Sequence, residues 1–127
     1  DVYYYYLAGG YEDETEYFQG LGVDKIHQYA KKFGIGSITG IDLPGEITGI
    51  LPSREWKESN LNEPWVIGDT YQLGIGQSYL KITPLQMLVA TAAIANEGYI
   101  VNPKIVSQIG DSDQKIELSS PKRKIDI

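Results

Sequence analysis

The stretch "KITPLQMLVATAAIANEG", residues 81–98, carries the clearest secondary-structure signal of the sequence. Thr83 is a favourable N-cap, Pro84 suits the first helical position, and Gln86 completes a capping box of the T-x-x-Q type. The residues that follow are apolar on nearly every side, and Gly98 is placed to end the helix. The stretch therefore predicts a central, buried helix, which is too short to cross a membrane.

Two more helices are predicted upstream of this stretch. Residues 23–33 carry apolar side chains at helical spacing, and Gly34 follows as a stop signal. Ser53 is placed to cap a short helix that contains Arg54, Trp56 and Lys57. The run from Val2 to Leu7, with its consecutive tyrosines, is compatible with either a strand or a buried helix segment.

The rest of the chain is predicted to form loops and a hairpin. Residues 34–53 hold five glycines and two prolines, which predicts an ordered, turning loop. We expect its apolar side chains to pin it to a core; they are Ile38, Ile41, Leu43, Ile47, Ile50 and Leu51. Residues 11–19 are interpreted as an exposed acidic segment. Residues 104–109 and 114–118, separated by a Gly/Asp turn at 110–113, predict a β-hairpin.

The composition excludes several classes of function. The chain has 127 residues, which fits one domain or a piece of a larger one, and its 42% hydrophobic content is enough for a modest core. With 17 acidic and 11 basic residues, its net charge of −6 argues against nucleic-acid binding. Lys122, Arg123 and Lys124 are interpreted as a solvated surface run.

The sequence also gives no support for metal or cofactor chemistry. The sequence has no cysteine, and its single histidine, His27, excludes a site with several histidines. A lone helical histidine of this kind is interpreted as a surface or core-edge residue. Because no dinucleotide or metal motif occurs, we expect neither a cofactor nor a metal. The chain begins at Asp1 without a methionine, from which we expect it to be cut from a longer protein.

Ser78 and Lys81 have the Ser-x-x-Lys spacing of a nucleophile and its basic partner in penicillin-recognising enzymes. The pair precedes the capping box at Thr83, so its side chains need not share a helix face. The same spacing recurs at Ser112/Lys115 and Ser119/Lys122, which shows how weak the bare pattern is. We therefore do not predict Ser78 to be catalytic.

Acidic residues give no clear catalytic pair. Asp42 and Glu46 lie in the glycine-rich loop, where carboxylates more often cap turns. Asp69 and Thr70 are interpreted as part of a turn or a helix start.

Three quoted segments together resemble one family. They are "TGIDLPGEITGILPSREWK" (39–57), "EPWVIGDTYQLGIGQSYLKITPLQM" (63–87) and "AAIANEG" (92–98). In order and spacing they are similar to the transpeptidase domain of class B penicillin-binding proteins, nearest to the elongation type, penicillin-binding protein 2. The resemblance extends from Asp1 to about Ile109. Its departures are a serine at Ser78, where glycine is frequent, and the acidic insert at 11–19.

The resemblance implies an α+β fold: the mostly helical middle portion of a serine β-lactamase/transpeptidase-like domain, with a C-terminal β-hairpin. The partial domain would span 1–127, with a helical subdomain at about 1–98 and the hairpin and tail at 99–127. Asp1 would be the third residue of a Ser-x-Asn/Asp triplet, and the nucleophile would lie outside the chain. No substrate-binding residue is identified.

The family implies a serine acyl-enzyme that cross-links the stem peptides of peptidoglycan and binds penicillin. It also implies a membrane-bound glycan polymerase as partner and a single membrane anchor outside this chain, with the domain facing outward. The isolated chain would be inactive. Alternatives are a division-type transpeptidase, a β-lactam sensor, a β-lactamase, or a non-catalytic scaffold or binding module.

Overall fold

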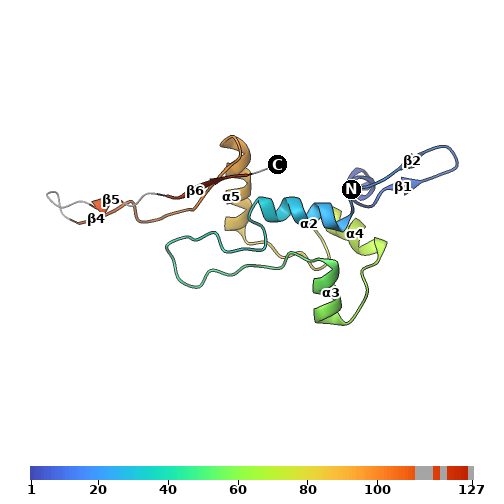
Figure 1. Cartoon of the computed structure of the whole chain (residues 1–127), viewed down its shortest axis with the longest axis horizontal. Helices are drawn as coiled ribbons and strands as arrows, with labels where there is room; N and C mark the ends of the chain where they lie inside the picture. Colours follow the sequence, from blue (N-terminus) through green and yellow to red (C-terminus); the bar gives the residue numbers. More distant parts are fainter. Residues whose placement is uncertain (111–115, 118–119, 126–127) are drawn as a thin grey trace. The chain divides into compact units, whose positions relative to one another are not determined.

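The computed structural model describes residues 1–110, 116–117 and 120–125 (Figure 1). The chain divides into two compact units. Unit 1 is formed by Asp1–Lys31 and Ile50–Lys81, and unit 2 by Lys32–Gly49 and Ile82–Ile127.

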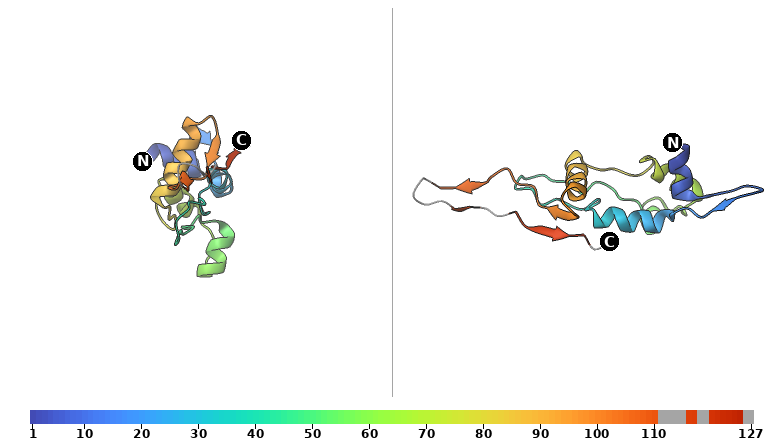
Figure 2. Two further views of the ribbon diagram at one scale, coloured as in Figure 1. Left: turned by 90° about the vertical axis from the view of Figure 1, so that its left-hand side faces the viewer. Right: turned by 90° about the horizontal axis from the view of Figure 1, so that it is seen from above.

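Unit 1 is built from helices and one short hairpin. Its elements are α1 (Val2–Gly9), β1 (Tyr11–Glu12), β2 (Tyr17–Phe18), α2 (Gly22–Lys32), α3 (Arg54–Leu61) and α4 (Ile67–Gly74). The tyrosine run, which the sequence left open, is helical and forms α1. The antiparallel β1–β2 hairpin lies within the predicted acidic segment and extends away from α1 and α4 (Figures 1 and 2).

Helices α1 and α4 pack closely because their contact is made by small residues. A Cβ built on Gly74 would lie 2.4 Å from the Cβ of Ala8, so glycine is what allows this approach. Ala8 and Leu73 are both buried beside the contact. The two helices therefore form the packed centre of unit 1.

The predicted helices α2 and α3 are both present. α2 begins at Gly22 and ends at Lys32, and its Val23 is fully buried. The Ser53 hydroxyl accepts a hydrogen bond from the Trp56 backbone N–H at 3.1 Å, which confirms the predicted cap. α3 continues to Leu61 and is therefore longer than the short helix expected.

Unit 2 contains the helix that the sequence signalled most clearly. Its elements are α5 (Pro84–Ala95), β3 (Tyr99–Val101), β4 (Gln108–Ile109), β5 (Ile116–Glu117) and β6 (Lys122–Lys124). The capping box is confirmed: Thr83 Oγ1 accepts from the Gln86 N–H at 3.1 Å, and Gln86 Oε1 accepts from the Thr83 N–H at 3.0 Å. Gly98, just past the helix, has a positive φ of 84°.

The prediction that α5 is buried on nearly every side is wrong for the described chain. Gln86, Val89 and Ala93 are buried, whereas Leu88 and Ile94 are 63% and 72% exposed. The apolar composition shows what a helix is able to bury, but burial requires a facing element. Among the described residues, only one side of α5 is covered.

The glycine-rich loop is ordered but is not pinned as expected. Ile38, Leu43 and Ile47 are 60%, 50% and 67% exposed, which corrects the prediction that they anchor the loop to a core. Polar contacts hold it instead: Gln86 Nε2 donates to the carbonyls of Ser37 at 2.7 Å and Thr48 at 2.8 Å. Periodicity could not reveal this, because the partners lie far apart in sequence.

The predicted C-terminal hairpin is confirmed where it is described. β4 pairs antiparallel with β5, with Ile109 opposite Ile116. Residues 104–107 are not in a strand, and 111–115 and 118–119 lie outside the described residues. β3 also pairs with β6, so the basic run at Lys122–Lys124 forms an exposed strand rather than a free tail.

Candidate functional site

Ser78 and Lys81 are not arranged as a catalytic pair. Ser78 lies in a turn before α5 and has a left-handed φ of 67°, a conformation that glycine adopts most easily. Lys81 forms a β-bridge with Ile50, through backbone hydrogen bonds of 2.8 and 2.9 Å. A helical turn would be needed to direct the Lys81 amine toward the Ser78 hydroxyl. The segment is not such a turn, as expected from its position before the capping box.

Asp1 lies at the N-terminal end of α1. Its backbone carbonyl accepts the Tyr5 N–H at 3.1 Å, which starts the helix. Its carboxylate does not cap α1, and the residue is exposed. Within the described chain, this carboxylate is thus available to another group.

α4 fixes the position of α1. The Tyr71 hydroxyl donates to the Gly10 carbonyl at 3.1 Å, and the Tyr71 ring packs edge-on against Tyr5 at 5.9 Å between centroids. Together with the close contact of Gly74 and Ala8, this holds α1 along much of its length. α4 therefore holds the helix at whose start Asp1 lies.

The start of α4 is held by a buried lysine. Lys57, only 4% exposed, places Nζ 2.8 Å from Asp69 Oδ2 and 3.6 Å from Glu63 Oε2. The same Asp69 oxygen accepts the Val66 N–H at 2.9 Å. The hydrogen bond to Asp69 raises the pKa of Lys57, so the ammonium form is favoured. One ion pair thus joins α3 to the first turn of α4.

The tryptophans complete this cluster. Trp65 Nε1 donates to the buried Thr70 hydroxyl at 2.9 Å, and the Trp56 ring lies 5.4 Å from that of Tyr79. Asp69 and Thr70 lie in the first turn of α4, which confirms their interpretation as a helix start. Sequence reasoning missed the burial of Lys57, because its nearer partner, Asp69, comes from a different helix.

Asp42 and Glu46 do not form a catalytic pair; Glu46 binds backbone N–H groups of its own loop, as expected, whereas Asp42 binds a distant segment. Asp42 accepts the backbone N–H groups of Ile105 at 2.8 Å and Val106 at 2.9 Å. These bonds lower the pKa of Asp42, the one from Ile105 most. Glu46 accepts from the backbone N–H groups of Thr39 and Gly40.

Metal and membrane features are not found in the described residues. His27 Nδ1 lies 3.1 Å from the Pro52 carbonyl, at the half-buried edge of α2. No group of three or more potential metal ligands occurs among the residues described. In that same part of the chain, no helix has both the length and the apolar character needed to span a membrane.

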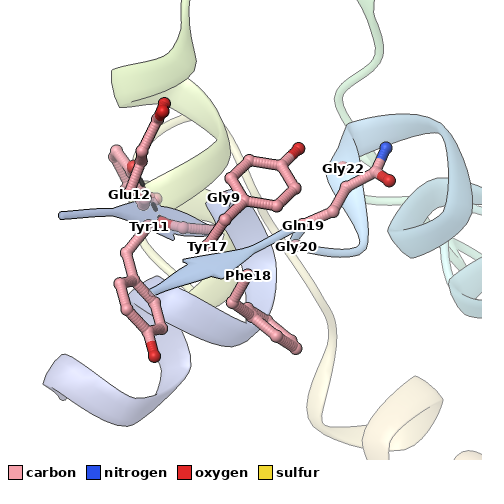
Figure 3. Close-up of a pocket in the computed structure, with 10 residues that line it drawn as sticks. Gly9, Tyr11, Glu12, Tyr17, Phe18, Gln19, Gly20 and Gly22 are labelled. Atoms are coloured by element: carbon pink, nitrogen blue, oxygen red, sulfur yellow. Dashed lines mark hydrogen bonds between the residues drawn. The ribbon is translucent and has the colours of Figure 1, made fainter. Parts of the chain in front are cut away.

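A pocket of about 350 Å³ lies beside the β1–β2 hairpin (Figure 3). Its side chains include Glu12, Tyr17, Gln19 and Tyr71, and glycines such as Gly9 and Gly20 form part of its wall. From the sequence, this segment is predicted only to be acidic and exposed. The aromatic residues between glycines were the signal that could have identified a pocket.

The sequence matches a known family over almost its whole length. A model described as "Penicillin binding protein transpeptidase domain" matches residues 2–126. The peptidoglycan D,D-transpeptidase MrdA of Escherichia coli K12 is 37% identical over 101 residues, which are 80% of this chain and 16% of that protein. The chain therefore spans about one sixth of that relative's length.

Solved structures give the same result. Penicillin-binding protein 2 of Pseudomonas aeruginosa, in complex with WCK 5153, is 34% identical with a TM-score of 0.72, covering 97% of this chain and 25% of that one. The Helicobacter pylori protein in complex with MreC is 35% identical with a TM-score of 0.69, covering 82% and 18%. A chain from a peptidoglycan synthase complex is 29% identical with a TM-score of 0.70, covering 82% and 17%.

These similarities confirm the fold predicted from the resemblance. The helices and short strands match part of a penicillin-binding transpeptidase domain. The relatives named above are of the MrdA and penicillin-binding protein 2 type, which is the type that the resemblance indicated.

Proposed function

We propose, since the chain belongs to the penicillin-binding protein transpeptidase family, that the full-length protein is a peptidoglycan D,D-transpeptidase active in cell-wall elongation. The observation that carries this proposal is the match to penicillin-binding protein 2, which covers 97% of the chain and both of its units. The alternative, that the chain is a non-catalytic scaffold or binding module, has no comparable support from these matches.

The proposed reaction proceeds through an acyl-enzyme. A serine hydroxyl attacks the carbonyl of the D-Ala-D-Ala bond of a stem peptide, and terminal D-alanine leaves as the new ester forms. An amine of a second stem then attacks the ester, forming the cross-linking amide and returning the serine hydroxyl. We place this serine outside residues 1–127, because Ser78 and Lys81 are not arranged for the chemistry.

Within this proposal, the chain supports the active site. Asp1 is the third residue of the Ser-x-Asn/Asp triplet, and its exposed carboxylate at the start of α1 orients the triplet serine or contacts substrate. α4 holds α1 through Tyr71 and Gly74, and Lys57 holds α4. The isolated chain is expected to be inactive.

The partners follow from the same family. We propose peptidoglycan stem peptides as substrates and β-lactams as inhibitors of the full-length protein. A membrane-bound glycan polymerase is the proposed partner, because one structural relative belongs to a peptidoglycan synthase complex. We place the transpeptidase domain on the outer side of the bacterial cytoplasmic membrane, held by an anchor outside this chain.

The test is reconstituted cross-linking by the full-length protein. Glycan strands bearing pentapeptide stems are incubated with the protein, and the products are analysed by mass spectrometry. We expect cross-linked dimers and released D-alanine, both abolished by penicillin. Strands that stay uncross-linked while the protein binds penicillin would contradict transpeptidation and favour the sensor alternative.

A further inference from the structure

The pocket beside the β1–β2 hairpin carries side chains that the proposed reaction does not use. Glu12 lies directly opposite Tyr17 in the ribbon, and Tyr11 lies opposite Phe18. Because successive strand residues point to opposite faces, Glu12 and Tyr17 share one face. Figure 3 shows these two side chains on one side of the ribbon, with Tyr11 and Phe18 on the other.

Close backbone packing explains why glycines occur in the wall of the pocket. A Cβ on Gly20 would lie 2.3 Å from the Gly10 nitrogen, so the close approach of the two chain segments requires glycine. An open pocket of about 350 Å³ lies beside this approach. That volume is within the range of small ligand sites.

The surroundings of the pocket are strongly acidic. No lysine or arginine occurs before Lys25, and Asp13, Glu14 and Glu16 lie in the same hairpin as Glu12. Among the described residues, no cation pairs with Glu12. Acids at a ribbon edge also discourage edge-to-edge pairing, which explains their presence in general. Protection of the edge does not explain why Tyr17, which is 70% exposed, lies beside this pocket.

The backbone of the hairpin that carries these groups is ordered by hydrogen bonds of its own. Asp13 Oδ1 accepts the backbone N–H groups of Thr15 at 2.7 Å and Glu16 at 2.8 Å, which orders the tip. The Tyr11 hydroxyl donates to Glu16 at 2.6 Å and ties the tip to the strand. An ordered backbone leaves only the side chains of the pocket to be immobilised when a ligand binds, which lowers the entropy cost of binding.

We propose that this pocket binds the guanidinium group of an arginine carried by a partner protein segment. The Glu12 carboxylate would accept two parallel N–H bonds from the planar guanidinium. The exposed face of Tyr17 would stack on the same cation, and the Gln19 amide oxygen would accept a further N–H. The surplus of negative charge around the hairpin attracts a basic segment and repels an acidic one.

The test uses the full-length protein and two short peptides. Acetyl-Gly-Arg-Gly amide and its citrulline counterpart are nearly equal in shape, but citrulline has no charge. Saturation-transfer difference NMR measures their weak binding. We expect the arginine peptide to bind on the order of fivefold more tightly, the size of an exposed charge-pair contribution.

Two matched variants locate the effect. Glu12→Gln should reduce the affinity for the arginine peptide to that of the citrulline peptide. Glu14→Gln removes the same charge from the same hairpin, but Glu14 does not line the pocket, so the preference for arginine should remain. Tyr17→Leu should weaken arginine binding by about threefold through loss of the cation–π contact.

Three results would overturn the proposal: equal affinity for the two peptides, an equal loss in Glu12→Gln and Glu14→Gln, or no binding of either peptide. The last result would mean that other parts of the full-length protein cover the pocket. These readouts do not depend on serine acylation, so they remain informative if the proposed transpeptidation fails.

Discussion

At the scale of single residues, buried charge and backbone hydrogen bonds matter more than any recognisable catalytic spacing. Ser78 has the spacing of a nucleophile but stands in a left-handed turn. Lys57 was predicted only as part of the short helix after Ser53, yet it is buried and joins two helices through Asp69. A charge removed from water needs a partner, so the loss of either member should be costly.

Replacing Lys57 by methionine tests this ion pair. The variant leaves Asp69 without its cation, and we expect the melting temperature of the full-length protein to fall by roughly 5–10 °C. Arg54→Met is the matched control, because Arg54 lies on the same helix as Lys57 but forms an exposed ion pair. Its partner is Asp24, and the two side chains are 51% and 74% exposed. A shift of at most about 1–2 °C is expected there. Equal shifts in both variants would argue against a special role for Lys57.

Asp42 predicts a pH dependence. Its folded-state pKa is lowered by the Ile105 and Val106 N–H groups, so its stabilisation is present above the unfolded value and is lost as pH falls through the folded value. Thermal unfolding of the native protein and of Asp42→Asn, followed from pH 7 to pH values below 3.8, should show a stability difference that shrinks in acid. A difference that stays constant with pH would contradict this assignment.

At the scale of elements, the local signals were predictable and burial was not. The capping box at Thr83 and Gln86 and the Ser53 cap were readable because each involves residues three apart. Three features were not readable in this way: the exposure of Ile94, the burial of Lys57 and the pocket at Glu12. Each depends on which distant segment lies opposite. Periodicity describes one element at a time and contains no information about its neighbour.

Gln86 shows how a cap and a tertiary contact are combined in one side chain. It is 1% exposed, completes the capping box, and donates to the carbonyls of Ser37 and Thr48. Gln86→Ala should therefore cost about 2–4 kcal/mol, because it leaves a cavity and two unpaired carbonyls. Thr83→Ala removes only the cap and should cost about 1 kcal/mol. Chemical denaturation of the full-length variants measures both; equal costs would mean that the loop contacts contribute nothing.

At the scale of the whole molecule, the chain corresponds to only part of its relatives. It spans about one sixth of the length of its E. coli relative. Helix α5 exposes Leu88 and Ile94, and we expect the rest of the full-length protein to cover them, since exposed apolar faces of this kind mark interfaces. The family resemblance was readable because several segments kept their order and spacing. The catalytic contribution of Asp1 stays a prediction.

We propose that this chain supports a transpeptidase active site without supplying its nucleophile. The most direct test is to incubate the full-length protein with penicillin, digest it, and map the penicilloyl adduct by mass spectrometry. We predict one modified serine, outside residues 1–127, and no adduct on the isolated chain. An adduct on Ser78 would contradict this proposal, and would mean that the turn before α5 rearranges to bring Lys81 to the hydroxyl.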